Sequence, residues 1–397
     1  MSQRDATKSR SNAVTDPSPS PSSATPLGPK TAQPYPCITV IGHGSWGTAL
    51  AATAARAGRE VRLWGRRPEV TAEINAHAAN TTYLPGAALP EGIKASDDMA
   101  SAVAAADAVL LVTPSKSLRD ICTAIAPDLN PGTPVVLCAK GIEIGTGLLL
   151  HEVAAECLPG HPIGALSGPT FAKETVLGYP TAVTIAFDFT YEDRISPEES
   201  PAARMAVSLG SETFRPYISH DLIGVEIGGA VKNVIAIACG MMTGAGFAEN
   251  TRAVLIARGM EEMKSLAQAI GGSRETVTGL SGAADLTLTC SSQTSRNMSL
   301  GVQLGSGLAR PDCFEGRSVV VEGEVNAVSV VDLARRIGID MPIASAVHAI
   351  LHEGADLAQA FAELWARPIR SEHSNLDLEL SHPASPEDVR RFADTIR

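Results

Sequence analysis

Residues 37–54 read CITVIGHGSWGTALAATA, and this stretch decides the fold. An apolar run of strand length, Cys37–Ile41, leads into a G-x-G-x-x-G sequence and then into an Ala-rich segment typical of a helix. Glycines in this pattern allow a tight turn and let backbone N–H groups approach a pyrophosphate at the positive end of a helix. A glycine-rich packing turn is the simpler alternative. The order of strand, glycines and helix favours a dinucleotide site at Gly42, Gly44 and Gly47.

Short apolar runs alternate with Ala-rich segments of helical length well beyond this stretch. After Cys37–Ile41 the runs are Val61–Trp64, Ala108–Val112, Val135–Cys138, Ile163–Leu166 and Thr181–Phe187. A polar, Pro-containing loop is expected around Asp188–Pro201, and a last short strand near Thr213–Pro216. Strands that alternate with helices form a parallel, doubly wound sheet. The fold class that we expect is therefore α/β, with an N-terminal Rossmann-like doubly wound sheet domain followed by an all-α substrate domain.

From His220 onward the spacing of the apolar residues becomes helical. Helices are expected over Ile223–Met241, Thr251–Ile270, Asn326–Gly338 and Ala344–His352, with Asn250 as the N-cap of the second. A chain of 397 residues suggests two or three domains. We expect a disordered tail over residues 1–36, a dinucleotide-binding domain over 37–217, a helical substrate domain over 218–372, and a C-terminal tail with one short helix over 373–397.

The composition is that of an ordinary globular protein, with 44% hydrophobic and 19% charged residues. A net charge of −11 has the wrong sign for a broad nucleic-acid surface. The seven cysteines include no C-x-x-C pair, which predicts reduced core thiols. The start lacks an apolar signal segment, and the best candidate for a membrane span, Asn233–Ala248, is short and interrupted by glycines. We expect a cytoplasmic protein that binds no nucleic acid or metal and does not insert into a membrane.

Two arginines stand where an NAD site normally carries an acidic residue. That residue holds the ribose 2′-OH and lies about 20 residues beyond the glycines, at the end of the second strand. Here the stretch reads Leu63-Trp64-Gly65-Arg66-Arg67, with no carboxylate before Glu69. Arginines suit a 2′-phosphate, so the sequence predicts a preference for NADPH, with NADH possible. The alternative is that Arg66 and Arg67 form a solvated surface pair.

Lys232 stands inside the apolar segment Gly224–Ala238. Gly228 and Gly229 lie one helical turn before it, on the same face. Glycines in a helix cost stability, so this face is expected to accept a close approach. A lysine desolvated in such a groove can exchange protons near neutral pH. The alternative is a lysine whose long side chain reaches solvent from a buried helix.

A second polar segment, Thr289–Asn297, leads into a helix expected from Met298. Hydroxyls, an arginine and an asparagine at a helix N-terminus suit a single phosphate group, so Ser295, Arg296 and Asn297 form a candidate anion site. An ordinary capped helix is the alternative. Just upstream, Asp285 can hold a substrate hydroxyl or orient Lys232, with a helix N-cap as the simpler role.

These residues together resemble one family, the bacterial-type NAD(P)-dependent glycerol-3-phosphate dehydrogenases. The resemblance runs from about residue 37 to about residue 372, with motifs in the family's order. They are Gly42–Leu50, Ala139-Lys140-Gly141, Ser167–Glu174, Gly228–Val234, Ser295–Asn297 and Val320–Gly323. The resemblance implies a Rossmann domain, a helical substrate domain and the reduction of dihydroxyacetone phosphate to sn-glycerol 3-phosphate for phospholipid synthesis.

The resemblance also implies roles for individual residues. Lys232 matches the family's general acid/base, and Lys140 matches the lysine that lies between cofactor and substrate. Gly168, Thr170, Asp285, Ser295, Arg296 and Asn297 match substrate positions, with Arg296 on the phosphate and near the cofactor. Ser45, Trp46, Arg66, Ala172, Val320 and Glu322 match cofactor positions. The departures from the pattern are His43 in the glycine sequence, Thr251 before Arg252, and Ala284, whose methyl group stands where glycine is usual.

Three other functions compete with this interpretation. A related two-domain dehydrogenase for a hydroxy or keto acid would need an arginine for a carboxylate instead of a Ser-Arg-Asn turn. A nucleotide-binding sensor without catalysis would be expected to have lost Lys232, Lys140 or Arg296, and all three are present. A nucleophilic Cys290 lacks a histidine motif. For the assembled protein we expect a homodimer, in which the glycine-rich helical domain would bury the contact face.

Overall fold

The apolar runs of the N-terminal part form one sheet. The computed structural model describes residues 30–372 and 378–396, and within these residues the sheet has eight strands in the order β3-β2-β1-β4-β5-β6-β7-β8. Their bounds are β1 (Cys37–Ile41), β2 (Glu60–Trp64), β3 (Ile93–Ser96), β4 (Ala108–Leu111), β5 (Val135–Leu137), β6 (Ile163–Ser167), β7 (Thr181–Phe187) and β8 (Phe214–Ser219). Every pair of neighbours is parallel except β6 and β7, which run antiparallel.

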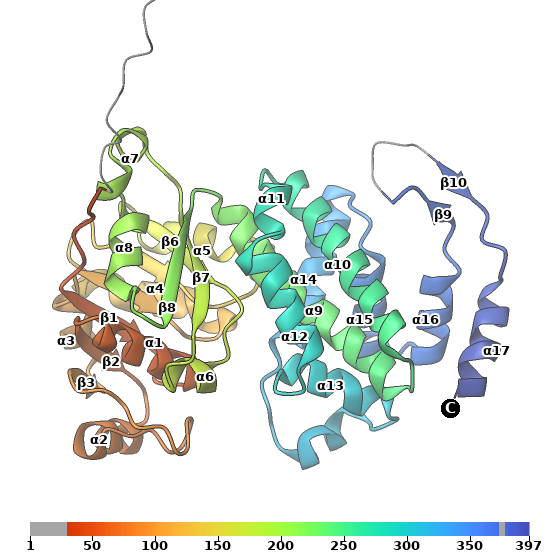
Figure 1. Ribbon diagram of the computed structural model, residues 1–397, viewed down its shortest axis with the longest axis horizontal. Coiled ribbons are helices and arrows are strands. Elements are labelled where there is room, and N and C mark those ends of the chain that lie inside the picture. The colour runs from red at the N-terminus through yellow and green to blue at the C-terminus, as the bar shows by residue number, and fades with distance from the viewer. Residues whose placement is uncertain (1–29, 373–377, 397) are drawn as a thin grey trace, which may run out of the picture. The chain divides into compact units, whose positions relative to one another are not determined.

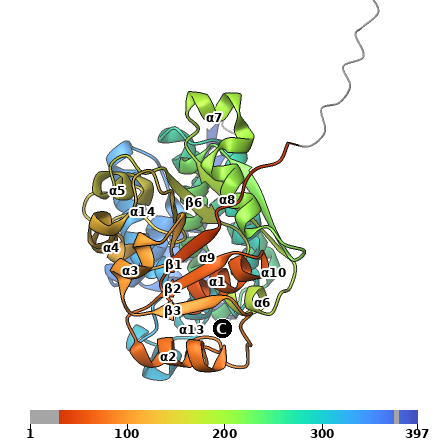
Figure 2. The ribbon, with the colours of Figure 1, turned by 90° about the vertical axis from the view of Figure 1, so that its left-hand side faces the viewer.

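Helices cover both faces of this sheet, as Figure 2 shows. Their bounds are α1 (Ser45–Arg56), α2 (Pro68–His77), α3 (Met99–Ala104), α4 (Leu118–Ile125), α5 (Leu150–Cys157), α6 (Ala172–Val176), α7 (Tyr191–Ile195) and α8 (Pro201–Leu209). The apolar residues of α1 and α8 pack on one face, and those of α3, α4 and α5 pack on the other. Strands covered on both faces need continuous apolar runs, and all residues of β1 and β4 are buried.

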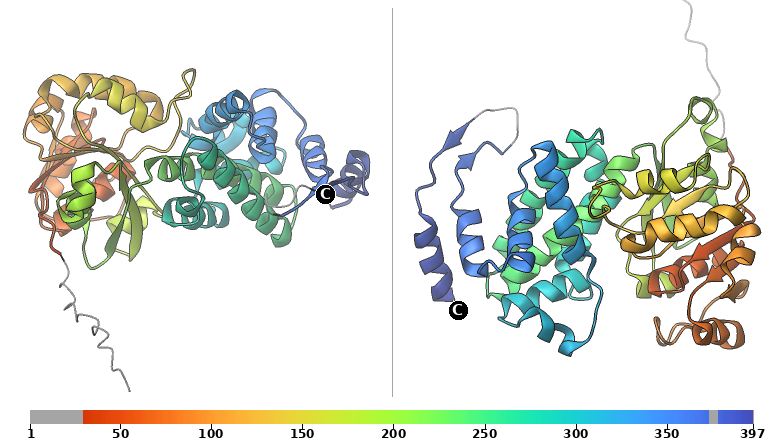
Figure 3. Two further views of the ribbon diagram at one scale, coloured as in Figure 1. Left: turned by 90° about the horizontal axis from the view of Figure 1, so that it is seen from above. Right: turned by 180° about the vertical axis from the view of Figure 1, so that it is seen from behind.

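The chain is mainly helical after β8, and most of these helices pack around α9 (Figures 1 and 3). Their bounds are α9 (Leu222–Gly244), α10 (Glu249–Ala269), α11 (Arg274–Val277), the π-turn η4 (Leu280–Ala284), α12 (Asp285–Ser291), α13 (Arg296–Gly305), α14 (Glu322–Ile337), α15 (Pro342–His352) and α16 (Leu357–Trp365). Two short strands, β9 (Ile369–Arg370) and β10 (Glu379–Leu380), precede α17 (Pro386–Ile396). The expected fold class is confirmed.

The central helix α9 is apolar around its whole circumference, which is typical of a helix buried in a protein core. Contrary to the sequence analysis, its span Leu222–Gly244 is long and apolar enough to cross a membrane, and it is the one such helix among the described residues. Inside the protein, however, 94% of its apolar window is buried. Two of the glycines that were expected to interrupt it, Gly240 and Gly244, serve a close packing contact with α13, and the third, Gly246, lies beyond the end of the helix.

Glycines on both helices allow this contact. A Cβ atom at Gly240 would lie 2.3 Å from the carbonyl oxygen of Met298, and one at Gly301 would lie 2.2 Å from that of Ile237. Gly244 and Gly305 continue the contact one turn further along. The two backbones are therefore in contact, with no room for side chains between them.

The structure differs from the sequence analysis at several places. Strand β3 was not expected, because it is an edge strand of four residues with an exposed Lys94. Asn250 does not cap α10, since that helix begins at Glu249 after Ala248. The expected loop at 188–201 contains α7 and a turn of 3₁₀ helix at Pro197–Glu199.

The ends of the chain contain ordered contacts. Most of the expected N-terminal tail lies outside the described residues, but Tyr35 is buried, and its backbone N–H donates to Ser208 of α8. The guanidinium of Arg204 stacks over the Tyr35 ring at 4.0 Å.

All seven cysteines are unpaired, and six of them are buried.

Candidate active site

The glycine sequence forms an open cradle between β1 and α1. Gly42 has a positive φ of 119°, and a Cβ there would lie 2.6 Å from the carbonyl oxygen of Val112. A Cβ at Gly47 would lie 1.7 Å from the carbonyl oxygen of Gly42, whereas the space beside Gly44 is open. Within residues 30–372 and 378–396, no side chain caps the first N–H groups of α1. Free N–H groups beside an open glycine position fit the pyrophosphate of a dinucleotide.

Ser45 and Trp46 open α1 beside this cradle. Both side chains are half-buried. Ser45 Oγ donates to the carbonyl oxygen of Tyr83 at 3.0 Å, and Trp46 packs at the edge of the sheet's core. The two residues therefore fix the start of the helix against the segment that follows α2.

Arg66 and Arg67 follow β2 and are both exposed. The Nε atom of Arg67 lies 2.7 Å from Glu69, and its guanidinium lies 6.0 Å from the centre of the Tyr83 ring. Hydrogen bonding to Tyr83 and Glu69 raises the pKa of Arg67. Among the residues that the structure describes, no side chain engages Arg66. Arg66 is therefore the arginine whose side chain is available to a ligand.

Lys140, Lys232 and Asp285 meet in a buried cluster, although they come from distant parts of the chain. Lys140 follows β5, Lys232 lies in the middle of α9, and Asp285 begins α12. Lys140 Nζ lies 2.6 Å from Asp285 Oδ2, and Lys232 Nζ lies 2.9 Å from Asp285 Oδ1. Each carboxylate oxygen thus holds one ammonium group. Asp285 is not the N-cap, because it is the first residue of α12 and Ala284 holds the cap position.

Burial and charge act in opposite directions in this cluster. Burial lowers the pKa of Lys232, and the nearby Lys140 lowers it further, while Asp285 works against both. Burial raises the pKa of Asp285, but the charges of Lys140 and Lys232 outweigh burial, so that its net pKa is lowered. The cluster therefore holds an ionised carboxylate beside a lysine that gives up its proton more readily than usual.

The glycines before Lys232 allow two neighbouring segments to pack closely against α9. A Cβ at Gly228 would lie 2.8 Å from the carbonyl oxygen of Ser281 in η4. One at Gly229 would lie 3.2 Å from both Lys140 Cγ and Ser167 Oγ. The close approach expected from the sequence is therefore made by η4 and by the stem of Lys140.

The segment Ser295–Asn297 begins α13. Ser295 caps the helix by accepting the N–H of Met298 at 3.3 Å. Arg296 is exposed, and no described residue engages its guanidinium. Asn297 is buried, and its amide donates to Asn233 Oδ1 at 2.8 Å and accepts the N–H of Gly323 at 2.9 Å. The sequence grouped these three residues, but only the Arg296 side chain is exposed and unpartnered.

The remaining candidates surround these features. The carbonyl oxygen of Gly168 accepts from Lys140 Nζ and from Thr170 Oγ1, both at 3.4 Å. Ala172 is the first residue of α6 and is half-buried. Glu322 begins α14 and accepts from Asn233 Nδ2 at 3.3 Å, while Val320 is exposed.

Three buried polar residues at the cluster were assigned no role of their own from the sequence, although Thr289 and Ser167 begin stretches that were noted there. Lys232 Nζ donates to Thr289 Oγ1 at 2.8 Å, and Asn326 Nδ2 donates to the carbonyl oxygens of Lys140 and Ala230, each at 3.1 Å. Ser167 Oγ and Asn326 Oδ1 have no hydrogen-bond partner within the described part of the chain. Asn326 gave no signal of this role, because it lies in a helix, α14, that also carries Glu324, Asp332 and Arg335.

Cys290 is completely buried beside Cys239. Burial raises the pKa of its thiol well above the usual value. A buried, protonated thiol is a poor nucleophile, so the geometry argues against the alternative in which Cys290 reacts.

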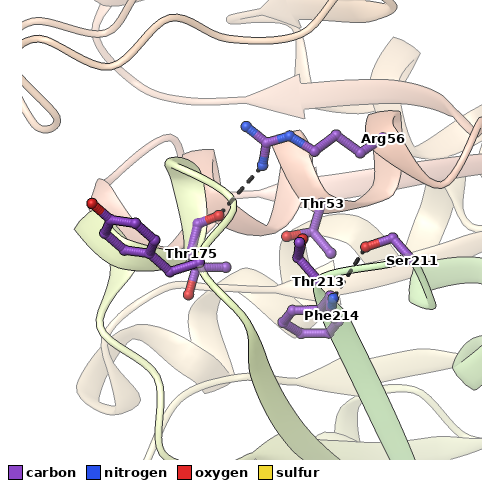
Figure 4. Close-up of a pocket in the computed structure, with 7 residues that line it drawn as sticks. Thr53, Arg56, Thr175, Ser211, Thr213 and Phe214 are labelled. Atoms are coloured by element: carbon purple, nitrogen blue, oxygen red, sulfur yellow. Dashed lines mark hydrogen bonds between the residues drawn. The ribbon is translucent and has the colours of Figure 1, made fainter.

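A small polar hollow lies on the sheet part, between α1, α6 and β8 (Figure 4). Arg56 reaches across it and donates to the carbonyl oxygens of Thr175 and Val176, and Ser211 accepts the N–H of Phe214. Because Arg56 already serves backbone carbonyls, this hollow stabilises the junction of α1 with α6 rather than offering an anion site.

Comparison with known families decides among the alternatives. The models for the N-terminus and the C-terminus of NAD-dependent glycerol-3-phosphate dehydrogenase match residues 37–191 and 221–362. The chain belongs to this family. The family identification made from the sequence is confirmed, and with it the class of NAD(P)-dependent dehydrogenase.

Individual members of the glycerol-3-phosphate dehydrogenase family are similar over most of the chain. The glycerol-3-phosphate dehydrogenases (NAD(P)+) of Parvibaculum lavamentivorans and Rhodospirillum rubrum are 49% and 48% identical, over 85% and 84% of this chain and 98% and 93% of theirs. The crystal structure of the glycerol-3-phosphate dehydrogenase of Coxiella burnetii is 38% identical, with a TM-score of 0.76 over 83% of this chain and 99% of that one.

Proposed function

We propose that this chain reduces dihydroxyacetone phosphate to sn-glycerol 3-phosphate, with NADPH preferred and NADH possible, and that the product supplies phospholipid synthesis in the cytoplasm. The observation that carries the proposal is the buried pair of ammonium groups on Asp285, with Lys232 in α9 and Lys140 after β5. The family and the names of its members support the reaction.

Lys232 is the general acid of the proposed reaction. The cofactor, when bound, supplies the hydride. The Lys232 ammonium donates a proton to the oxygen that becomes negative, and its lowered pKa favours this transfer. Asp285 and Thr289 hold the ammonium in place, and Lys140 adds a second positive charge at the same oxygen.

Arg296 anchors the substrate phosphate at the start of α13, where free guanidinium donors meet the positive end of a helix. Ser295, Asn297, Gly168 and Thr170 complete the substrate site. An anchor remote from the reacting carbon uses binding energy to fix the orientation of the ketone.

The cofactor contacts the cradle and the segments next to it. Gly42, Gly44 and Gly47 admit the pyrophosphate, and Arg66, with Arg67 beside it, receives the 2′-phosphate. The further cofactor residues are Ser45, Trp46, Lys140, Ala172, Arg296, Val320 and Glu322. We also propose the domain division at residues 217 and 218 and assembly into a homodimer.

The test is NADPH oxidation by the purified protein on addition of dihydroxyacetone phosphate, followed by the absorbance of the nicotinamide and repeated with NADH. Dihydroxyacetone and a keto acid are the control substrates. We expect oxidation only with the phosphorylated ketone. The variant Lys232→Met should lose about 10²–10⁴-fold in kcat while it still binds NADPH.

Two outcomes would contradict the proposal. If the protein binds NADPH but oxidises it with none of these ketones, it acts on another substrate or not at all. If Lys232→Met retains the wild-type kcat, Lys232 is not the general acid.

A further inference from the structure

We propose that His43 is a positioning residue that sets the selectivity for a cofactor with a 2′-phosphate. The inference rests on the proposed preference for NADPH. His43 lies in the glycine sequence, between Gly42 and Gly44, where the sequence analysis found a departure from the family's pattern. Its side chain reaches from this turn to the turn after β2 that carries Arg66.

The His43 ring accepts a hydrogen bond from the backbone of Arg67. The residue is 5% exposed, and its Nε2 atom accepts the backbone N–H of Arg67 at 3.3 Å. Burial lowers the pKa of His43, so that the ring stays neutral and Nε2 remains an acceptor. A neutral acceptor of this kind fixes the backbone of the turn.

The same ring also packs against Gly65. A Cβ atom at Gly65 would lie 1.7 Å from His43 Cδ2, so only glycine leaves room for the imidazole. The backbone N–H of Gly65 donates to the carbonyl oxygen of Ser96 at 3.1 Å. His43 thus holds the residues on both sides of Arg66.

His43 is itself firmly held. Its carbonyl oxygen accepts from Thr48 Oγ1 at 3.1 Å and from Asn80 Nδ2 at 2.9 Å. Its ring lies 5.9 Å from the ring of Tyr83, over which the guanidinium of Arg67 also lies. Because the imidazole is fixed, it holds the turn at Gly65–Arg67 in a constant position relative to the glycine turn at Gly42–Gly44.

Fixing this turn should favour NADPH over NADH, because the two cofactors differ at the 2′ position of the ribose. Arg66 is exposed and has no described partner, so a phosphate must restrain both its side chain and its backbone. When Gly65 and Arg67 are already fixed, less conformational entropy is lost on binding. NADH lacks the 2′-phosphate and gains nothing from this arrangement.

The test is equilibrium binding of NADPH and NADH, measured by the fluorescence of the nucleotide in the absence of substrate. We expect His43→Ala to weaken NADPH binding by about tenfold while NADH affinity stays unchanged. His43→Gln places an amide oxygen near the position of Nε2 and should restore most of the selectivity. The matched control is His77→Ala, at the exposed end of α2.

A double variant tests whether His43 acts through Arg66. If it does, His43→Ala should cause little further loss of NADPH affinity in an Arg66→Ala background. Equal weakening of both cofactors by His43→Ala, or an unchanged ratio of the two dissociation constants, would overturn the inference. A wild-type protein that binds NADH and NADPH equally would instead refute the proposed cofactor preference, so the two failures are distinguishable.

Discussion

Asp285 engages two ammonium groups with a single buried carboxylate, and this arrangement controls when Lys232 gives up its proton. The carboxylate raises the pKa of Lys232, while burial and Lys140 lower it, and the net direction is downward. Reduction of a ketone requires the ammonium form. Its rate should therefore fall as the pH rises through the lowered pKa of Lys232.

Asp285→Asn removes the largest of the effects that raise the pKa of Lys232. The pKa of Lys232 should fall further, because burial and Lys140 remain. We expect the alkaline loss of kcat for reduction to move to lower pH, measured at saturating substrate and cofactor. Asp128→Asn, at an exposed position, is the control and should leave the profile unchanged. An identical profile in Asp285→Asn would show that another group titrates.

The site was partly predictable at the level of single residues. Lys232 was identifiable because a lysine in an apolar helix is costly, and Arg296 because a cation at a helix start is chemically specific. No individual role could be predicted for Thr289 or Ser167, since hydroxyl residues are common and only packing brings these two to Lys232 and Gly229.

At the scale of elements, the strands buried on both faces were predictable and the edge of the sheet was not. Strands β1 and β4 are continuous apolar runs, so their burial on both faces could be predicted from the sequence. Within the described sheet, strand β3 pairs with no strand other than β2, and the side chain of Asn75 in α2 supplies its other backbone hydrogen bonds. Its four residues include a lysine. The antiparallel direction of β7 was also not predicted, because an apolar run does not encode its direction.

The crossing of α9 and α13 is the element contact most sensitive to added volume. Alanine in place of a helical glycine normally gains about 1 kcal/mol. At Gly240 the added Cβ would meet the carbonyl oxygen of Met298 at 2.3 Å and Gly301 Cα at 2.8 Å. Both are backbone atoms and cannot rotate away, so the helices must separate.

We therefore expect Gly240→Ala to lower the free energy of unfolding by about 1–3 kcal/mol, as overpacking does, despite its better helix propensity. The measurement is the midpoint of denaturant unfolding. The control is Ser306→Ala at the exposed C-cap of α13, which adds no atom to the contact. A stabilised Gly240→Ala variant would mean that the two helices can move apart at little cost.

At the scale of the whole molecule, buried polar contacts join the sheet part to the helical part. Lys140 and Asp285 are 145 positions apart in the chain, and the side chain of Asn326 donates to the carbonyl oxygen of Lys140 across 186 positions. A second junction lies between α5 and α9, where His151 Nδ1 is 2.5 Å from Glu226 Oε2. The backbone N–H of His151 also donates to Glu226 Oε1 at 3.0 Å.

Glu226 is almost completely buried, and burial raises its pKa. Burial lowers the pKa of His151, but the contact with Glu226 outweighs it, so that the net pKa is raised. Removing the imidazole leaves the carboxylate with one backbone donor. Breaking a buried pair on one side costs about 3–5 kcal/mol, and the partial exposure of His151 makes this an upper limit.

We expect His151→Ala to destabilise the protein toward that limit in denaturant unfolding. His161→Ala is the matched control, because its partner is the carbonyl oxygen of Thr133 and no buried charge is left behind. The double variant His151→Leu, Glu226→Leu should recover much of the loss, since it removes the buried carboxylate together with its partner. If the double variant is as unstable as His151→Ala, packing at the junction of α5 and α9, and not the unpaired charge, accounts for the effect.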